Sequence, residues 1–290
     1  GFYRQDRLWG SLWLSYGGWL FRPGLYLYDL PSSALVRFSD GAIRRVGRER
    51  RGVAVSASLP VLLESNVYSS WLLLTLIGRS EQERYFWHRQ SDHPTLLRDT
   101  RQTVEPIVTV AYRLQQNLRD LMPNQGVSWT TRALRDLRRT TLARREAYRS
   151  SLYLYLPLLA RYNVGLRLDA GLLWQNRGDV FDLTTFLPRG WEEVFLGRGT
   201  FGRLGALALV PLKFVDNGLV ILPFYIEALY LYGFAETVRI LDGASSGARD
   251  FSAIGGGAGV QLRLFSHLRL DLRAGMAYRL RDGKWQTVWR

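Results

Sequence analysis

A strict two-residue alternation of apolar and charged side chains is the feature that most constrains the fold of this chain. It is clearest in HLRLDLRAGMAYRLRDGKWQTVWR, residues 267–290. Because successive side chains of a β-strand point to opposite faces, the pattern predicts a strand with one apolar and one charged face. Residues 267–281 would extend roughly 45–50 Å at about 3.3 Å per residue, far more than a usual strand. Alternation suits either a sheet between a core and water or a barrel wall between lipid and a wet lumen, and this length favours the barrel.

The composition is compatible with a barrel and excludes several other classes. The chain has 290 residues, 47% of them hydrophobic, and contains no cysteine. The lack of cysteine excludes a disulfide scaffold and thiolate metal sites. The stretch that comes nearest to a transmembrane helix, residues 219–235, is interrupted by Pro223 and Glu227. The sequence therefore predicts no transmembrane helix.

The chain is strongly basic, with a formal net charge of +14, and only Lys213 and Lys284 are lysines. Arginine binds phosphate bidentately, which would suit nucleic acid or the phosphates of lipopolysaccharide. Two basic runs, 44–51 and 132–149, are predicted to lie in external loops, the second partly helical, where they would meet such phosphates. A GC-rich genome would also produce many arginines, so both explanations stay open.

Three segments share one turn pattern, in which an alternating stretch reaches a proline and an asparagine follows six residues later. The pairs are Pro60 and Asn66, Pro157 and Asn163, and Pro211 and Asn217. Proline lacks the N–H that a strand ladder needs, and asparagine tolerates the left-handed turn conformation. The pattern predicts three short hairpins of one design.

Longer polar connections, at 78–103, 176–198 and 236–254, separate these hairpins. Alternate turns of an antiparallel meander lie at opposite ends, so one end would carry short turns and the other long loops. Outer-membrane barrels have this asymmetry, with short periplasmic turns and long external loops. We therefore expect an all-β fold, a transmembrane antiparallel barrel of about twelve strands that forms a single domain over residues 1–290. Residues 8–28 count as one strand here, although Gly17, Gly18 and Pro23 could divide them, and fourteen strands are not excluded.

Aromatic residues are frequent in the first strand region, between Trp9 and Tyr28, and Tyr153 and Tyr155 flank a short turn. Tryptophan and tyrosine prefer the headgroup level of a membrane and form girdles at both rims of a barrel. Ordinary core aromatics are the alternative for each residue taken singly.

Three stretches of the C-terminal part carry a series of motifs: LPRGWEEVFLGRGTFGRLGALALVPLKF (187–214), LYLYGFAE (229–236) and GGGAGVQLRLFSHLRLDLRAGMAY (255–278). This series resembles the bacterial surface-antigen superfamily of outer-membrane barrels, which includes the barrel-assembly insertase, two-partner secretion transporters and propeller-associated barrels. In that family an Arg-Gly-aromatic motif lies in a long external loop that folds back into the lumen. Pro188 and Trp191 replace the family's usual branched aliphatic residue and phenylalanine, and Glu236 stands where the family has aspartate. The order of elements agrees over residues 50–282, and the motifs agree over 187–278.

The resemblance implies that Arg189, Gly190 and Trp191 form the lumen motif, with Arg198 and Gly199 as a weaker candidate. An arginine inside a barrel must be solvated or paired, because a bare buried charge is costly. The predicted lumen charges are Asp169, Glu227, Arg269, Asp271 and Arg273, with Glu227 and Asp271 the expected partners of Arg189. Such an arrangement would act as a plug or gate, or only as a salt bridge that stiffens the barrel.

No motif for catalysis is present: the sequence has no phosphate loop, no G-x-S-x-G and no cysteine nucleophile, and His88, His93 and His267 lack metal-ligand spacing. We expect no enzymatic activity, no metal and no cofactor. The expected function is that of an outer-membrane anchor or passage domain in the lipid bilayer. Lipopolysaccharide is a candidate ligand, and a periplasmic protein or an upstream domain is a candidate partner. The alternatives are a small diffusion channel and a soluble basic β-protein that binds nucleic acid.

Overall fold

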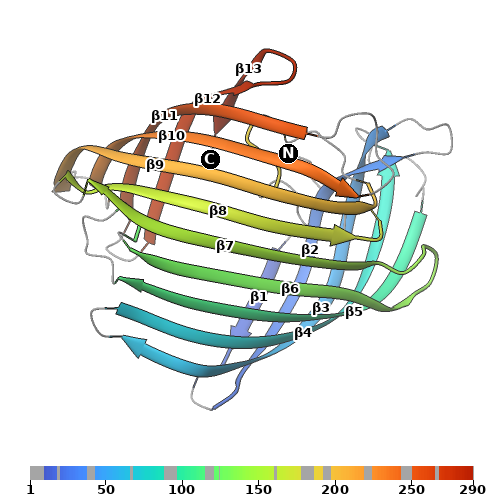
Figure 1. The fold of residues 1–290 in the computed structure, drawn as a ribbon. Coiled ribbons are helices and arrows are strands. Elements are labelled where there is room, and N and C mark those ends of the chain that lie inside the picture. Colours follow the sequence, from blue (N-terminus) through green and yellow to red (C-terminus); the bar gives the residue numbers. More distant parts are fainter. Residues whose placement is uncertain are drawn as a thin grey trace.

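The chain folds into one antiparallel sheet of 13 strands, in which each strand pairs with the next one along the sequence (Figure 1). The computed structural model describes residues 10–17, 20–37, 43–65, 68–87, 97–114, 121–123, 125–159, 162–177, 186–191, 197–218, 224–242, 250–264 and 268–289. The strands are β1 (Gly10–Ser15), β2 (Arg22–Arg37), β3 (Ile43–Ser65), β4 (Tyr68–Trp87), β5 (Leu97–Leu114), β6 (Gly126–Arg139), β7 (Glu146–Leu159), β8 (Val164–Gln175), β9 (Gly199–Gly218), β10 (Phe224–Asp242), β11 (Asp250–Leu264), β12 (Leu268–Arg279) and β13 (Lys284–Trp289).

The sheet curves round, so that β1–β3 lie behind β7–β10 in Figure 1 and the inner face encloses a lumen. No ladder joins β13 to β1 among the residues that the structure describes. The all-β antiparallel fold that the alternation predicted is confirmed. In the same described part of the chain, no helix is long and apolar enough to cross a membrane.

The strand count differs from the expected twelve because residues 8–28 form two strands. β1 and the first half of β2 pair with each other, from Gly10 opposite Asp29 to Ser15 opposite Gly24. Chain reversal between them lets β1 pair with β2, and β1 is an edge strand of the described sheet. With an odd count, β1 and β13 run in the same direction.

The three predicted hairpins are present as the pairs β3–β4, β7–β8 and β9–β10. Each proline lies at an irregularity of the ladder: the register shifts next to Pro60, next to Pro157, and between Pro211 and Lys213. A bulge is one of the few places where a strand tolerates a residue without an N–H. Asn163 has a φ of 53°, as expected of a left-handed turn residue. Asn217 is not a turn residue, because β9 continues through it and it lies opposite Ile226, and Asn66 lies outside the described residues.

The outer face of the sheet carries a continuous set of apolar side chains. Its members are between about a third and two thirds exposed: Leu12, Leu27, Val55, Leu74, Leu76, Trp129, Tyr148, Leu152, Leu154, Leu168, Leu172, Trp174, Leu204, Leu229, Leu231, Ile254, Leu272, Met276 and Trp285. We call these residues the apolar belt. The alternation predicted these faces correctly on β5, β8 and β12, where Glu105, Asp169 and Ala277 are buried on the inner face.

On β10 the predicted faces were wrong beyond Ile226. The sequence places Phe224, Ile226, Tyr230, Tyr232 and Phe234 on one face, opposite Glu227. A register shift lies between Ile226 and Ala228, and an extra residue of this kind reverses the faces that follow it. Tyr230, Tyr232 and Phe234 are consequently buried on the inner face, as Glu227 is, whereas Leu229 and Leu231 are exposed on the outer face.

Two of the three long connections are mostly strand. β4 and β5 remain paired out to Tyr85 opposite Leu97, and β10 and β11 out to Arg239 opposite Asp250. The basic runs 44–51 and 132–149 likewise belong to β3, β6 and β7, with a turn only at 140–145. Polar residues on both faces hide the period of two, so these strand ends were predicted as loops. The connection at 176–198 remains the long one.

Aromatic rings on the inner face of β10 pack directly over glycines of β11 and β12. A Cβ on Gly259 would overlap the ring of Tyr230, one on Gly275 would overlap the hydroxyl of Tyr232, and one on Gly255 would lie 2.7 Å from Phe234. Tyr153 and Tyr155, predicted as girdle residues, also belong to this interior, where Tyr155 is 9% exposed. The glycines leave the space that these rings fill.

Replacement of Gly259 by alanine should therefore destabilise the sheet, because the ring of Tyr230 cannot move aside without disturbing its neighbours. Overpacking of this kind costs about 1–3 kcal/mol. The measurement is the temperature at which the folded band disappears in a heat-modifiability gel. Gly78→Ala is the control, since a Cβ there would be 3.7 Å from its nearest neighbour, Val55. Equal shifts in the two variants would contradict the packing argument.

Candidate functional site

The long connection between β8 and β9 turns into the lumen at residues 186–191. Phe186, Leu187 and Trp191 are 1%, 3% and 4% exposed. They belong to one apolar cluster with inner-face residues of β6–β13. We call this connection segment, 186–191, the inner loop. A loop without paired backbone rarely lies in an interior. Here its side chains supply the packing that holds it.

Arg189 lies on the inner wall of β10 and meets a carboxylate there. Its backbone N–H donates to Glu236 Oε2 at 2.9 Å, and its Nε lies 3.5 Å from Glu236 Oε1. The guanidinium also lies over the rings of Phe234 and Tyr232, 4.3 and 5.8 Å from their centroids. Cation–π contacts of this kind are strongest where water is excluded, and Arg189 is only 8% exposed.

Gly190 and Trp191 complete the inner loop. Gly190 has a φ of 84°, and a Cβ there would lie 3.2 Å from Ala277 Cβ. The Trp191 indole N–H donates to the carbonyl of Ser252 at 3.2 Å, and its ring meets Phe251 edge-on at 5.2 Å. The guanidinium of Arg279, on β12, lies over the Trp191 ring, 3.7 Å from its centroid. The positive φ and the close approach to β12 both favour glycine between the two anchoring side chains.

Arg203 of β9 connects the inner loop to two strands. Its Nε donates to Asp169 at 3.0 Å, its Nη1 donates to the carbonyl of Phe186 at 2.9 Å, and its Nη2 donates to Glu236 at 3.2 Å. The guanidinium fork therefore bridges β8, β10 and the loop. Arg203 is not among the lumen residues predicted from the sequence. Arg203 lies between Gly202 and the apolar Leu204, which face outward. The alternation of side chains along a strand could therefore have predicted that Arg203 faces inward.

The other predicted lumen charges form separate pairs. Glu227 pairs with Arg263 of β11, and Asp271 pairs with Arg273 at 2.5 Å and receives the Tyr230 hydroxyl. Arg269 lies opposite Arg263 in the ladder, but its side chain lies outside the described residues. Glu227 and Asp271 were the expected partners of Arg189, and the carboxylate that the structure brings to it is Glu236. The weaker candidate, Arg198, is exposed and directly precedes β9.

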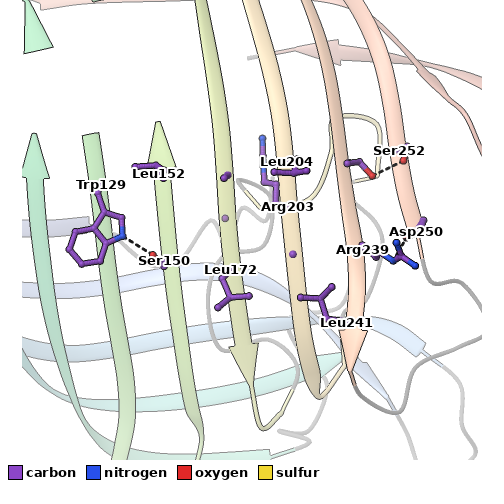
Figure 2. Close-up of a pocket in the computed structure, with 14 residues that line it drawn as sticks. Trp129, Ser150, Leu152, Leu172, Arg203, Leu204, Arg239, Leu241, Asp250 and Ser252 are labelled. Carbon is purple, nitrogen blue, oxygen red and sulfur yellow. Dashed lines mark hydrogen bonds and ion pairs between the residues drawn. The ribbon is translucent and has the colours of Figure 1, made fainter. Parts of the chain in front are cut away.

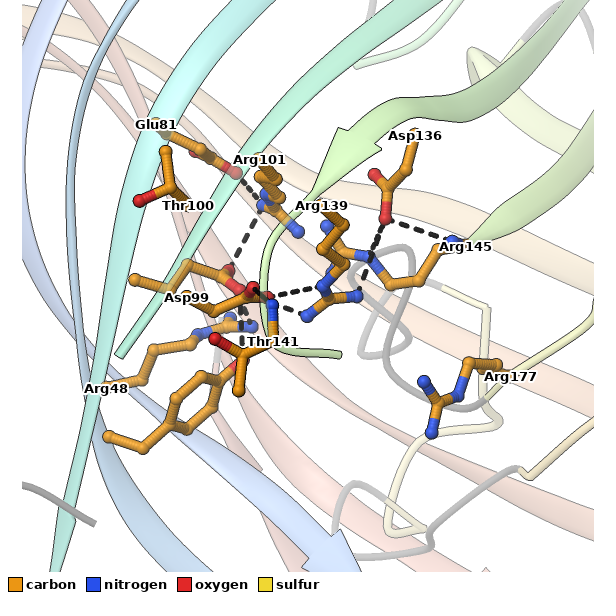
Figure 3. A network of polar contacts seen from close by, with 12 residues as sticks. Arg48, Glu81, Asp99, Thr100, Arg101, Asp136, Arg139, Thr141, Arg145 and Arg177 are labelled. Atoms are coloured by element: carbon orange, nitrogen blue, oxygen red, sulfur yellow. Dashed lines mark hydrogen bonds and ion pairs between the residues drawn. The ribbon is translucent and has the colours of Figure 1, made fainter. Parts of the chain in front are cut away.

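A second network lines the inner face of β3–β7 (Figure 3). Arg101 contacts both Glu81 and Glu83, and Arg139 contacts Glu83, Asp99 and Asp136. Asp136 also accepts from the backbone N–H and the Nε of Arg145, at 3.0 and 3.1 Å. All three arginines are almost completely buried from solvent. These contacts connect β4, β5 and β6 with the turn before β7, in the part of the lumen that the inner loop does not fill.

A segment between β5 and β6 enters the lumen from the opposite end. Met122 is 8% exposed and joins the same apolar cluster as the inner loop, with Leu121 packed against it. Its Cγ lies 2.9 Å from where a Cβ on Gly165 would be, so Gly165 provides the notch that Met122 occupies. This contact was not predicted from the sequence. The pairing of a β5–β6 methionine with a distant glycine leaves no local pattern to detect.

The residues that the structure describes include no group of three or more His, Cys, Asp and Glu side chains that could hold a metal ion. The three histidines lie outside the described residues. The lumen chemistry is therefore that of arginine–carboxylate pairs and aromatic rings.

No family model matches this chain, and no curated protein matches it. Among solved structures, the chain is similar to BamA from Haemophilus ducreyi lacking POTRA domains 1–3, with a TM-score of 0.49 and 13% sequence identity. The match covers 96% of this chain and 61% of the BamA chain. The chain thus spans less than two thirds of that protein's length.

Arg189 and Glu236 should be energetically coupled if the inner loop is held as described. In a double-mutant cycle of Arg189→Ala and Glu236→Gln, the coupling energy should be about 1–3 kcal/mol, because the groups share one charge network. The measurement is the midpoint of urea unfolding in detergent. Glu105 is the control acid, since it is held by Arg79 on another part of the wall. Additive effects for both acids would show that Arg189 is an ordinary loop arginine.

Proposed function

We propose that this chain is the membrane-spanning barrel of a bacterial outer-membrane protein. Its lumen is closed by the inner loop from one end and by residues 121–123 from the other. It acts either as a membrane anchor for periplasmic partners or, with such partners, as a passage for other molecules, and it catalyses no reaction. The resemblance of residues 187–278 to the surface-antigen superfamily supports the same assignment.

One observation carries the proposal: the outer face is apolar where the inner face is charged. The apolar belt leaves large side chains such as Leu204 and Leu76 62% and 52% exposed. Soluble proteins rarely expose a contiguous apolar surface of this extent. The inner faces of the same strands carry Arg203 and Arg79, each paired with a carboxylate. A bilayer outside and water or protein inside satisfy both faces.

The filled lumen favours a gated passage over an open diffusion channel. Phe186, Trp191 and Met122 occupy the half that β8–β13 enclose, and ion pairs cross the half that β3–β7 enclose. A free pore of this strand number would need inward side chains that leave a continuous water path. The diffusion channel remains the second candidate, because the half enclosed by β3–β7 carries several buried ion pairs.

A nucleic-acid function receives less support from the placement of the basic runs. Within 132–149, Arg132, Arg139 and Arg145 join acids on the inner face, whereas Arg135 is exposed on the outer face beside Glu146. Phosphate backbones are bound by basic surfaces that point in one direction. Alternation divides this run between two faces.

Leu76→Arg should impair membrane assembly much more than Ile77→Arg. The two residues are adjacent, but Leu76 belongs to the outward apolar belt, whereas Ile77 pairs with Glu105 on the inner face. A lipid-facing arginine near mid-depth costs roughly 2–4 kcal/mol, and an inward one can pair with the acid. The measurement is the yield of heat-modifiable protein in outer-membrane fractions. Equal yields of the two variants, or wild-type protein that is monodisperse in buffer without detergent, would contradict the membrane proposal.

Trp191→Ala should open the lumen. Truncating a buried tryptophan costs about 3–5 kcal/mol, and it frees the inner loop from Phe251 and Arg279. In planar bilayers the wild-type protein should show little current and the variant frequent, larger openings. Trp129→Ala, on the outer face, is the control and should conduct as wild type does. Steady wild-type conductance equal to that of the variant would favour the diffusion channel instead.

A further inference from the structure

A shallow groove crosses the outer face of the sheet from β6 to β11 (Figure 2). Its volume is about 780 Å³, and Trp129, Leu152, Leu172, Leu204 and Leu241 form its raised walls. Neighbouring strands lie about 4.8 Å apart, so a groove over six strands is roughly 24 Å long. It is continuous with the apolar belt, to which four of these wall residues belong.

Small residues make the floor of the groove. Ala170, Gly202 and Thr237 occupy outward positions between the larger wall residues. A Cβ on Gly202 would lie 3.4 Å from Leu241 Cδ1, so the leucine leans over the glycine. The groove therefore exists because outward positions on neighbouring strands alternate between small and large side chains.

The polar atoms of the floor are satisfied by one another. The Trp129 indole N–H donates to Ser150 Oγ at 2.8 Å, and the hydroxyls of Thr237 and Ser252 are 2.8 Å apart. Satisfied hydroxyls lose much of their demand for water. The floor therefore presents methyl and methylene groups to a ligand that has no polar atoms of its own, such as an acyl chain.

Two opposite charges stand at one end of this apolar floor. Arg239 of β10 and Asp250 of β11 line the groove, with Nε and Oδ1 3.6 Å apart and side chains 68% and 58% exposed. This distance is longer than a hydrogen bond. The guanidinium and the carboxylate both keep donor and acceptor sites that face outward, at the place where a lipid headgroup would follow its chain.

We propose that the groove binds one phospholipid with a zwitterionic phosphoethanolamine headgroup, its acyl chain on the floor, its phosphate on Arg239 and its ammonium on Asp250. The inference rests on the proposed membrane function and adds a specific lipid site to it. Arginine matches phosphate bidentately. An anionic headgroup such as phosphatidylglycerol would offer its phosphate to Arg239 but no ammonium to Asp250, so the ion pair favours the zwitterion.

The test is native mass spectrometry of the full chain in detergent after delipidation. The protein is titrated with phosphatidylethanolamine and with phosphatidylglycerol of identical acyl chains. Wild-type protein should retain one phosphatidylethanolamine in preference to phosphatidylglycerol. Arg239→Ala should weaken that binding by about tenfold or more, as expected for loss of a charge-assisted contact. Asp250→Asn should abolish the preference between the two lipids, and Gly202→Phe, which fills the floor, should weaken both.

Arg135→Ala is the matched control, since Arg135 and Glu146 form another outward cross-strand pair, 68% and 43% exposed, that does not line the groove. It should bind as wild type does. Equal binding of the two lipids by wild-type protein, tighter binding of phosphatidylglycerol, or equal losses in Arg135→Ala and Arg239→Ala would each overturn the proposal. These outcomes leave the membrane assignment intact, because that assignment fails only if Leu76→Arg and Ile77→Arg assemble equally well or the wild-type protein needs no detergent.

Discussion

Each charged side chain on the inner face needs an opposite charge within contact distance, because a bare charge in a filled lumen costs several kcal/mol. This requirement decides which parts of the chain lie together. Arg203 satisfies it by joining Asp169, Glu236 and the carbonyl of Phe186, and so fixes the inner loop to two strands at once. Arg139 does the same for β4, β5 and β6. The ladders align the strands, and these arginines determine what fills the space between them.

The faces of the strands could be predicted from the sequence wherever the chain lies between two unlike environments. On β8, Asp169 and Leu168 obey the period of two, because one side is apolar and the other polar. Near Gln82 and Thr100, which are outward-facing and polar, both sides are polar and the period disappears. Strand ends in such surroundings were predicted as loops. The alternation of apolar and polar side chains depends on a difference between the two environments. A strand with the same environment on both faces therefore shows no alternation.

The candidate site was predictable only in part, and a single bulge explains much of the rest. The resemblance predicted the inner-loop residues Arg189, Gly190 and Trp191. The regular alternation of side chains along β10 then predicted Glu227 as the inward acid that pairs with Arg189. The irregularity after Ile226 adds a residue to β10, which turns Glu236 inward as well as Glu227. Bulges depend on how neighbouring strands meet, which one strand's sequence does not encode. The contact of Met122 with Gly165 is hidden for the same reason.

The two halves of the lumen differ in the cost of opening them. On the side of β8–β13, moving the inner loop away would expose Phe186, Leu187 and Trp191, and each buried large apolar side chain stabilises its position by about 1.5–3 kcal/mol. On the side of β3–β7, Arg101 and Arg139 contact several acids each, so water or a polar guest can replace one contact while others persist. Binding energy from a partner is therefore needed to expel the loop, whereas small polar rearrangements suffice along the charged wall. A passage through this barrel would begin along β3–β7 and widen only when a partner replaces the contacts of the inner loop.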